Sequence, residues 1–450
     1  MIENDAFKLL LINLFHLNPD DIANILCTTF NKMMVLIVTL ADKHQACPYC
    51  GFTAPKIKEY VTKEITHSAL TTQKCIIKYR ARRYKCSCCG KTYYEFNPFV
   101  FKSQKISILT VHNILKDLKD FNETFTSVAR RYHVSPTSVS TIFDNHVDIG
   151  RNPLPEIINF DEVYAFKSEK SKYVCVLLDF KKQIPVDVLP NRKKEYLLNY
   201  FQKIPLEERK KVKYACSDMY EVYRDVVHKV FPSCCMLLDY FHLSQDFHRK
   251  MNEVRIKVMK GYKDNKASDE YYLLKKFNWL LFKNPEDEDK YGRLFDVERE
   301  RKYNSHFKSY MNYYDLRKKL LEINNDLTIC YSLKLELVDF YSKSTIDNAK
   351  VNLENLIRSC IDTNIDEMIA FSNNLINWKQ EIINSFTIVG TEYKVEADKG
   401  QVVVCNKKVN NAIIENRNKI IKCIKNNANG YTNWSRFRNR VMYVLDPNAT

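Results

Sequence analysis

The sequence lacks any long run of apolar residues. No segment reaches the roughly eighteen consecutive apolar residues that a helix needs to span a bilayer, and the most apolar stretch, residues 33–41, has only the length of a strand. The first residues are acidic rather than basic before a short leucine-rich segment, which is not the pattern of a secretory signal. We therefore expect no membrane association and a cytoplasmic location.

Acidic residues are too few to balance the basic ones. The chain has 70 Lys and Arg against 54 Asp and Glu, a net charge of +16. Such a charge says nothing about fold, but it favours a polyanionic partner such as nucleic acid, or less often an anionic membrane. The hydrophobic content of 45% is typical of a globular protein, and 450 residues allow two to four domains.

The fifteen cysteines fit a reducing compartment with a metal site better than a disulfide framework. Two C-x-x-C pairs, each followed by glycine, are typical of a zinc ribbon, in which paired thiolates hold a tetrahedral ion and the glycine permits the turn. The expected ligands of this structural zinc are Cys47, Cys50, Cys86 and Cys89. Cys88 is the expected spare, although Cys86 with Cys88 is an alternative pair. Around them we predict helices over residues 7–17 and 20–26 and a strand over 35–40.

Residues 105–147 have a helical pattern with a turn at 133–135. Helices are expected over 106–118, 126–132 and 138–146, the last capped by Ser135 or Thr137. A small residue, Ala129, would let two helices cross closely, which favours a helix-turn-helix over a plain three-helix bundle. In that motif the residues predicted to face the major groove of DNA are Thr137, Ser138 and Thr141.

After a proline-containing linker at 152–155 the pattern changes to strands. Three strands, a helix, a strand, a helix and a strand between residues 156 and 238 give the order of an RNase H-like mixed sheet. Asp161 lies on the first strand and Asp218 at the end of the fourth, which is its neighbour in that fold. Clustered carboxylates repel one another unless divalent cations neutralise them, and oxygen ligands suit Mg²⁺ or Mn²⁺.

The rest of the chain reads as a helical insertion followed by a return to the sheet. Residues 243–385 have helical patterns throughout, and aromatic residues such as Tyr272, Tyr310 and Tyr313 are expected in the core of this bundle rather than on a stacking surface. A hairpin over 385–404 precedes a helix over 410–431 that carries Glu415, with Ile413, Ile420 and Ile424 as its predicted apolar stripe. Alone, Glu415 would be an ordinary surface carboxylate.

Several segments together resemble one family. The cysteine pairs and the helix-turn-helix are followed by FDEVYAF, LLDYFHL, IENRNK and NGYTNWSRFRNRV, beginning at residues 160, 237, 414 and 429. This is the order seen in the ISL-three (ISL3) family of bacterial insertion-sequence transposases, which the chain resembles over nearly its whole length. The similarity is weakest over residues 1–40 and the helical insertion. It implies a DDE active site on an RNase H-like fold.

The resemblance also implies roles for individual residues. The catalytic, magnesium-binding acids would be Asp161, Asp218 and Glu415. Asp239 and His242, in an Asp-x-x-His signature, would shape the site or hold DNA, and Arg192 would contact a phosphate. Asn418 and Lys422, one and two turns beyond Glu415, are expected to contact DNA. The chain departs from the family where Asn410-Asn411-Ala412 replaces the usual Ser-Asn-Gly before the glutamate.

The predicted organisation is a multidomain α+β protein. Its predicted parts are a zinc-binding domain (1–100), a helix-turn-helix domain (101–150), a first RNase H-like part (151–242), an all-helical insertion (243–385) and a second RNase H-like part (386–450). The predicted function is a transposase, acting in the bacterial nucleoid, that binds terminal inverted repeats and cuts and joins double-stranded DNA as a homodimer or larger assembly. The alternatives are a catalytically silent DNA-binding regulator and a nuclease of the same fold.

Overall fold

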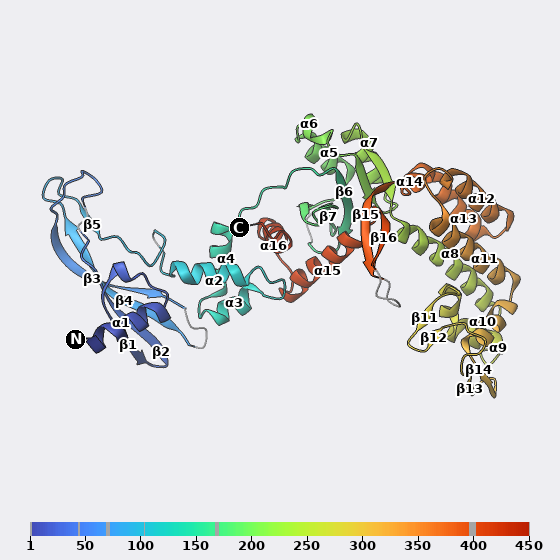
Figure 1. Cartoon of the computed structure of the whole chain (residues 1–450), viewed down its shortest axis with the longest axis horizontal. Helices are drawn as coiled ribbons and strands as arrows, with labels where there is room; N and C mark the ends of the chain where they lie inside the picture. The colour runs from blue at the N-terminus through green and yellow to red at the C-terminus, as the bar shows by residue number, and fades with distance from the viewer. Residues whose placement is uncertain are drawn as a thin grey trace. The chain divides into compact units, whose positions relative to one another are not determined.

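The computed structural model describes residues 2–43, 46–68, 73–102, 104–166, 171–395 and 402–449 (Figure 1). The chain forms two compact units that contain mixed sheets and many helices. The first consists of Met1–Arg151, Val163–Val174 and Arg417–Thr450, and the second of Asn152–Glu162 and Cys175–Asn416. Among the helices that the structure describes, none is long and apolar enough to cross a membrane.

The N-terminal sheet of the first unit has the strand order β1-β2-β4-β3, with β5 paired to β4. Its elements are α1 (Ile2–Leu14), β1 (Ile22–Phe30), β2 (Met33–Leu40), β3 (Lys56–Thr66), β4 (Cys75–Lys85) and β5 (Thr92–Tyr94). Asn31 and Lys32 both have positive φ angles, 48° and 60°, and form the two-residue turn between β1 and β2. Helix α1 covers this sheet, and Phe15, which follows the helix, is completely buried in the shared core.

The helix predicted over residues 20–26 is wrong. Pro19–Asp21 form a single 3-10 turn, η1, after which β1 pairs with β2 from Ile22↔Leu40 to Phe30↔Met33. Ile22 and Ile25 are both buried, which gives a helix-like spacing, because an irregularity between Ile22 and Asn24 shifts the alternation of the strand. The sequence pattern could not distinguish this bulge from a helical turn.

Three short helices follow in the first unit, close to their predicted positions: α2 (Ile108–Asp117), α3 (Phe125–Arg131) and α4 (Pro136–His146). Each begins at a hydroxyl residue whose side chain accepts a hydrogen bond from a backbone N–H. For α4 this residue is Ser135, which accepts from Ser138 N at 3.0 Å, so Thr137 is not the cap. His133 takes a positive φ of 54° in the turn between α3 and α4. The C-terminal helix α16 (Trp434–Leu445) adds Tyr443 to the same core.

Arg440 on α16 is expected to stabilise this helical group strongly. Its side chain is 1% exposed, and its Nη2 donates to the carbonyl oxygens of Asp120 and Glu123 at 2.9 and 2.8 Å. Arg440→Met removes both bonds and leaves the Glu123 carbonyl without this donor, whereas the Asp120 carbonyl still accepts from Glu123 N at 3.1 Å. With the packing of the buried side chain also changed, the free energy of unfolding should fall by about 3 kcal/mol. Urea unfolding measures this loss, with the exposed Lys422→Met as the control. A loss below about 1 kcal/mol would show that these hydrogen bonds are dispensable.

The main sheet has the strand order β10-β9-β6-β7-β8. Its strands are β6 (Ile157–Val163), β7 (Val174–Asp179), β8 (Pro185–Leu189), β9 (Tyr214–Ser217) and β10 (Cys235–Leu238). β7 and β8 are antiparallel, whereas β6, β9 and β10 run parallel to one another. Helices α5 (Lys194–Gln202), α6 (Leu206–Arg209) and α7 (Glu221–Val230) lie between the strands in sequence, and Phe160, Phe201 and Tyr223 pack together in the core. The chain order of strands and helices is the predicted one except for the short helix α6, which was not predicted.

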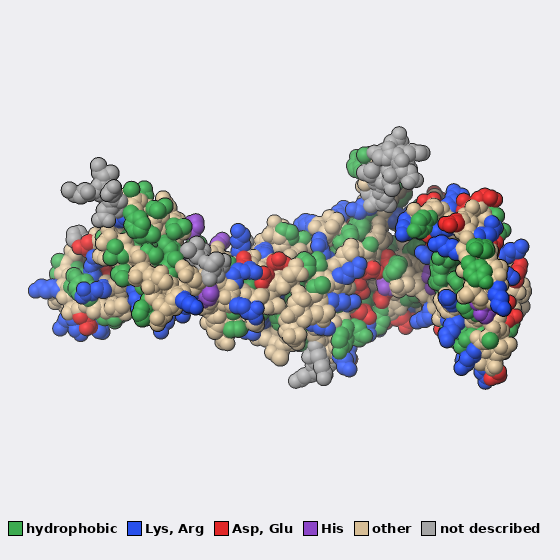
Figure 2. Space-filling model, turned by 90° about the horizontal axis from the view of Figure 1, so that it is seen from below, with side chains coloured by type: hydrophobic (Ala, Val, Ile, Leu, Met, Phe, Trp, Pro, Cys, Tyr) green, Lys and Arg blue, Asp and Glu red, His purple; other side chains and the backbone are tan. Residues whose placement is uncertain are grey.

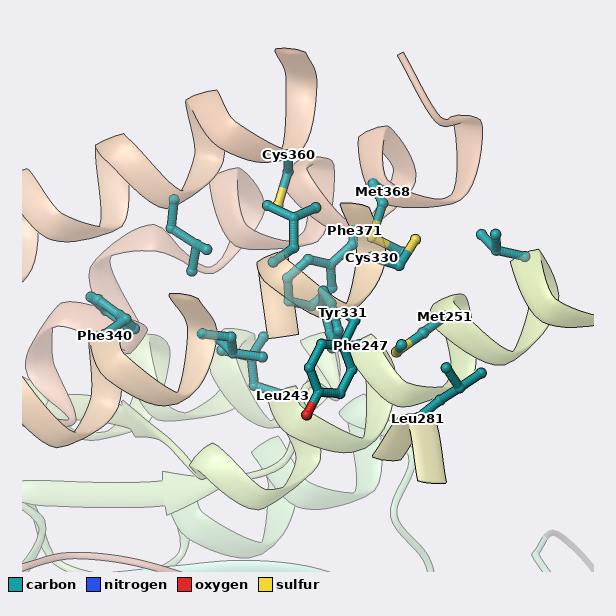
Figure 3. Close-up of a cluster of buried hydrophobic side chains, with 14 of the residues drawn as sticks. Leu243, Phe247, Met251, Leu281, Cys330, Tyr331, Phe340, Cys360, Met368 and Phe371 are labelled. Carbon is teal, nitrogen blue, oxygen red and sulfur yellow. The ribbon is translucent and has the colours of Figure 1, made fainter. Parts of the chain in front are cut away.

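A helical lobe follows the main sheet. Its helices are α8 (Tyr240–Lys260), α9 (Asp269–Lys276), η2 (Asn278–Phe282), α10 (Tyr313–Glu322), α11 (Asn325–Lys343), α12 (Ala349–Asp362), α13 (Asp366–Asn377) and α14 (Lys379–Asn384). In its core Phe247 of α8 meets Phe371 of α13 with ring centroids 5.1 Å apart, beside Tyr331 of α11 (Figure 3).

The lobe is not all-helical, contrary to the prediction. Two short hairpins, β11 (Glu288–Asp289) with β12 (Gly292–Arg293) and β13 (Lys302–Asn304) with β14 (Ser309–Met311), lie between η2 and α10. Strands of two or three residues are too short to give an alternating pattern in the sequence. Tyr310, expected in the bundle core, lies on β14 and is 69% exposed.

The predicted hairpin and the helix of Glu415 close the second unit's sequence. The hairpin consists of β15 (Ile388–Val395) and β16 (Val402–Lys408), and the helix is α15 (Ala412–Asn427). The buried isoleucines of α15 are Ile414, Ile421 and Ile424, whereas Ile413 and Ile420 of the predicted stripe are half-buried. Both sets have helical spacing, so only tertiary packing decides between them.

Candidate active site and metal centres

Three aspartates lie side by side where parallel strands of the main sheet end. The β6–β9 register pairs Asn159 with Cys216, and two residues further along it brings Asp161 opposite Asp218. The β9–β10 register pairs Ser217 with Leu238, so the next residues, Asp218 and Asp239, also face each other. Neighbouring strands are about 4.8 Å apart. The sheet therefore places three carboxylates in one row across β6, β9 and β10.

Glu415, on α15, lies beside Asp239 at one end of this row, together with a histidine; among the described residues, Asp161 and Asp218 are not part of this close group. The side-chain oxygens of Asp239 and Glu415 and the imidazole of His242 lie within 4.8 Å of one another. His242 Nε2 is 3.9 Å from Asp239 Oδ2 and 3.9 Å from Glu415 Oε1. His242 is in the first turn of α8, just after Asp239, so the α8 start and the α15 start meet at the end of β10.

Asn411 fixes the start of α15 against the sheet. Its backbone N–H donates to Asp239 Oδ1 at 3.1 Å, and its side-chain oxygen accepts from Asn159 Nδ2 at 2.7 Å. Asn159 Nδ2 also donates to the carbonyl of Asn410 at 2.8 Å. Asn159 and Asn411 are completely buried, so these bonds form away from water. Glu415 lies one helical turn after Asn411, so these bonds fix its position relative to the sheet.

The electrostatics of the row favour protonated acids in the absence of a cation. Burial and, secondarily, the neighbouring Asp218 raise the pKa of Asp161 to about 7, against the effect of the Glu162 backbone N–H. Burial also raises the pKa of Asp218 to about 6 and raises that of Asp239. Two or more buried carboxylates cannot all ionise unless positive charge compensates them.

The donor set fits a hard divalent cation. Among the described residues, Asp218 Oδ1, Asp239 Oδ2 and His242 Nε2 are buried side-chain atoms without a hydrogen-bond partner. Buried polar atoms are rarely left unpaired unless an ion or water satisfies them. Carboxylate oxygens are the ligands of Mg²⁺ and Mn²⁺, and an imidazole nitrogen is compatible with Mn²⁺.

Arg192 lies close to the row but is occupied by an acid. Its guanidinium forms an ion pair with Glu162, the residue after Asp161, and lies over the ring of Tyr220 at 4.7 Å. Glu162 also accepts a hydrogen bond from the hydroxyl of Tyr223 at 3.3 Å. The ion pair with Glu162 thus keeps the positive charge of Arg192 close to the carboxylates.

The four predicted zinc ligands come together in the first unit. Cys47 Sγ is 3.7 Å from Cys89 Sγ, and Cys50 Sγ is 3.5 Å from Cys86 Sγ. All four sulfur atoms lie within 4.8 Å of one another, and Cys88 is exposed and outside the group. Sulfurs bound at 2.3 Å to a tetrahedral ion would be about 3.8 Å apart, so the cluster has the size that Zn²⁺ requires.

The two cysteine pairs have the same local backbone. Gly51 N donates to Cys47 O at 2.8 Å and Gly90 N to Cys86 O at 3.0 Å, and both glycines have positive φ, 75° and 70°. Glycine adopts this conformation without the steric cost of a side chain. Backbone N–H groups of Cys89 and Cys88 lower the pKa of Cys86 to about 7, which favours the thiolate that binds metal.

The residues predicted to meet DNA differ in exposure. On α4, Thr137 and Thr141 are exposed and Ser138 is half-buried. All three line a 510 Å³ hollow in the first unit. On α15, Lys422 is exposed but Asn418 is buried, with 6% of its surface exposed.

Sequence reasoning gave Asp239 only a supporting place and did not consider Asn159, Asn411 or Glu162 as parts of the site. A signal for Asp239 was present, since β6, β9 and β10 each carry an aspartate at the end of an apolar run. Asn411 stands in the segment that departs from the family pattern, and the structure shows that its side chain contacts the sheet directly.

Comparisons with known proteins agree with the resemblance found in the sequence. A family model for ISL3-type DDE transposases, described as "Transposase", matches residues 158–397, just over half of the chain. The transposase for insertion sequence element IS1001 of Bordetella parapertussis is 19% identical over 409 residues, which are 90% of each chain. The matched region contains the aspartate row and the helical lobe, and the chain belongs to the ISL3 family of transposases.

Proposed function

We propose that the protein is an active DNA transposase with an RNase H-like catalytic domain. It recognises the terminal inverted repeats of an insertion sequence, cleaves DNA at the element's end and joins that end to target DNA. The observation that carries this proposal is the row of Asp161, Asp218 and Asp239 at the ends of parallel strands, with Glu415 beside Asp239. Since two element ends must be brought together, the working form is a homodimer or a larger assembly.

In this proposal Asp161, Asp218 and Glu415 are the catalytic acids and hold Mg²⁺ or Mn²⁺. A bound pair of such ions activates the attacking oxygen and stabilises the leaving one. Asp239 and His242 shape the site beside Glu415, where their unpaired atoms can share its cation, and Arg192 neutralises phosphate charge. In the cleavage step a water oxygen forms a bond to phosphorus and the bond to the 3′ oxygen breaks. In the joining step the freed 3′-hydroxyl attacks a target phosphate, and a target 3′ oxygen leaves.

The cysteine cluster, α4 and the helix α15 supply recognition of the DNA ends. The cysteine cluster holds a structural zinc, and α4 presents Thr137, Ser138 and Thr141 to the major groove. Lys422 contacts the phosphate backbone, and the buried Asn418 supports the helix that carries it. The net charge of +16 supports this assignment, because phosphate neutralisation provides most of the affinity of proteins for DNA.

The test is an incubation of the full chain with a labelled end of its own element, a supercoiled target plasmid and Mg²⁺. Label joined to the plasmid supports the transposase. Cleaved label without joining would instead indicate a nuclease, and retention of uncut label in a gel would indicate a silent regulator. Either of the last two results overturns the proposal.

Stabilisation of the protein by a bound cation should increase as pH rises. Asp161 has a pKa of about 7 in the folded metal-free chain against an ordinary value of 3.8. Folding therefore retains a proton that the unfolded chain releases, so metal-free stability should fall as pH rises from about 4 to about 7. Mn²⁺ must displace that proton, so the rise in melting temperature on adding Mn²⁺ should grow across the same interval. Asp161→Asn should reduce the pH dependence, with the raised pKa values of Asp218 and Asp239 accounting for what remains. A shift independent of pH in the wild type would contradict this assignment.

A further inference from the structure

A cavity of 660 Å³ lies in the helical lobe, where the two hairpins meet α9 and α10. Four tyrosines line it, Tyr272, Tyr291, Tyr303 and Tyr313, together with four cations, Lys276, Arg293, Arg299 and Lys302. Three acids, Asp289, Asp296 and Glu300, line it as well, so the cavity is aromatic and polar rather than uniformly basic. None of these residues belongs to the aspartate row or the cysteine cluster.

Two of the rings are open to solvent. Tyr291 is 68% exposed in the turn between β11 and β12, and Tyr303 is 58% exposed on β13. The turn depends on Gly292, which has a φ of 95°. Exposed tyrosines at one cavity are a feature of binding sites, because a rigid ring offers a large contact area at little cost in conformational entropy.

Cations surround the Tyr291 ring. The side-chain charges of Lys290, Lys302 and Arg299 lie 4.7, 5.8 and 6.0 Å from its centroid, and Arg299 is also 5.6 Å from the ring of Tyr313. Basic side chains are spread over the face of the lobe seen in Figure 2, with hydrophobic ones between them. Rings flanked by cations suit a ligand that combines a flat aromatic group with negative charge.

The cavity is held in shape before any ligand arrives. Arg299 Nη2 donates to Asp289 Oδ2 at 2.6 Å, and its Nη1 donates to the carbonyl of Arg293 at 3.0 Å. Asn312 is buried, and its side-chain amide donates to the carbonyls of Val297 and Arg299 at 3.1 Å each. These bonds join both hairpins to the start of α10, so little ordering is required on binding.

We propose that this tyrosine cavity binds an unpaired DNA base, stacked on Tyr291 and Tyr303 with its phosphate near Lys302. The identity of the ligand as DNA rests on the proposed function. A duplex keeps its base faces stacked on each other, so exposed tyrosines can reach only a base that has left the helix or belongs to a single strand. The cavity volume lies within the usual range of about 300–1,000 Å³ for sites that enclose one small ligand.

Fluorescence anisotropy of a labelled oligothymidylate of about 12 nucleotides tests this with the full chain and no added Mg²⁺. Tyr291→Ala and Tyr303→Ala should each weaken binding about tenfold, since one stacked base contributes about 1–3 kcal/mol. Tyr291→Phe should bind like the wild type because the stacking face remains. Tyr393→Ala on β15 is the matched control, since Tyr393 is 74% exposed and outside the cavity.

A second measurement identifies the contact itself. An oligonucleotide carrying bromodeoxyuridine should crosslink on irradiation to peptides that contain Tyr291 or Tyr303. Unchanged affinity in both alanine variants, or crosslinks confined to other peptides, overturns the proposal. A partner protein chain in the cavity would give the same unchanged affinity. Affinity for a blunt duplex should not change in these variants, so failure here is distinguishable from failure of the end-joining test.

Discussion

Replacing Glu415 by glutamine is expected to abolish DNA cleavage and joining. The substitution keeps the size of the side chain and removes its negative charge, so cation binding beside Asp239 and His242 is lost. Loss of a few kcal/mol of transition-state stabilisation corresponds to a rate reduction of about a thousandfold or more. The measurement is the rate of label transfer to the target plasmid, with the affinity for the element's end determined in parallel.

The control for this prediction is Glu253→Gln. Glu253 lies on α8, the helix that carries His242, and forms an exposed ion pair with Lys250 at 3.1 Å. It should join DNA at the wild-type rate. Glu415→Gln should retain the wild-type affinity for the DNA end, because Glu415 is not a recognition residue. Joining by Glu415→Gln at more than about a tenth of the wild-type rate would remove Glu415 from the catalytic set.

Replacing Cys86 by serine is expected to unfold the cysteine cluster and abolish binding to the element's end. The two cysteine pairs and the paired strands β4 and β5 share a small buried core, which consists of Cys47, Tyr84, Cys86 and Tyr93. With so little buried apolar surface, we expect the metal to supply most of the local stability. Structural zinc contributes about 10–16 kcal/mol to the folding of small zinc-binding peptides. We expect zinc content to fall from one ion per chain to none and end affinity to fall at least about a hundredfold.

Cys88→Ser is the matched control, since Cys88 is two residues away, exposed and outside the group of four. It should keep one zinc ion and full affinity. Zinc loss in Cys88→Ser together with zinc retention in Cys89→Ser would establish the alternative pair, Cys86 with Cys88. The aspartate row lies in the other compact unit, so the Cys86 variant should still take up Mn²⁺ there.

Much of the fold could be predicted because its elements have strong and simple patterns. β6 and β7 are strands whose residues are mostly apolar and almost all buried. Helices α2, α3 and α4 each follow a hydroxyl residue that caps them. The cysteine cluster was predictable because each pair carries its turn glycine with it. Asp161 and Asp218 could be placed in one site because Asp161 lies within a predicted strand and Asp218 directly follows another. The strand order of the predicted fold makes these two strands neighbours.

The rest depends on tertiary contacts that leave no local pattern. β1 has the spacing of a helix because its alternation is broken between Ile22 and Asn24. The strands of the two hairpins in the lobe are too short to give a pattern in the sequence. Tyr310 lies on one of them, so its exposure could not be predicted either. The place of Asp239 in the row follows from the register of β9 and β10, and strand register is fixed only when the sheet packs.

The contact between Asn411 and Asp239 has a consequence for how this protein can change. Asp239 precedes α8 and Asn411 precedes α15, so the segment that holds the helical lobe and the β15–β16 hairpin begins and ends at one hydrogen-bonded pair of residues. A segment whose two ends meet tolerates insertions and deletions without strain on the structure that holds its ends. The position of Glu415 therefore depends on this contact rather than on the length of the segment between the two residues.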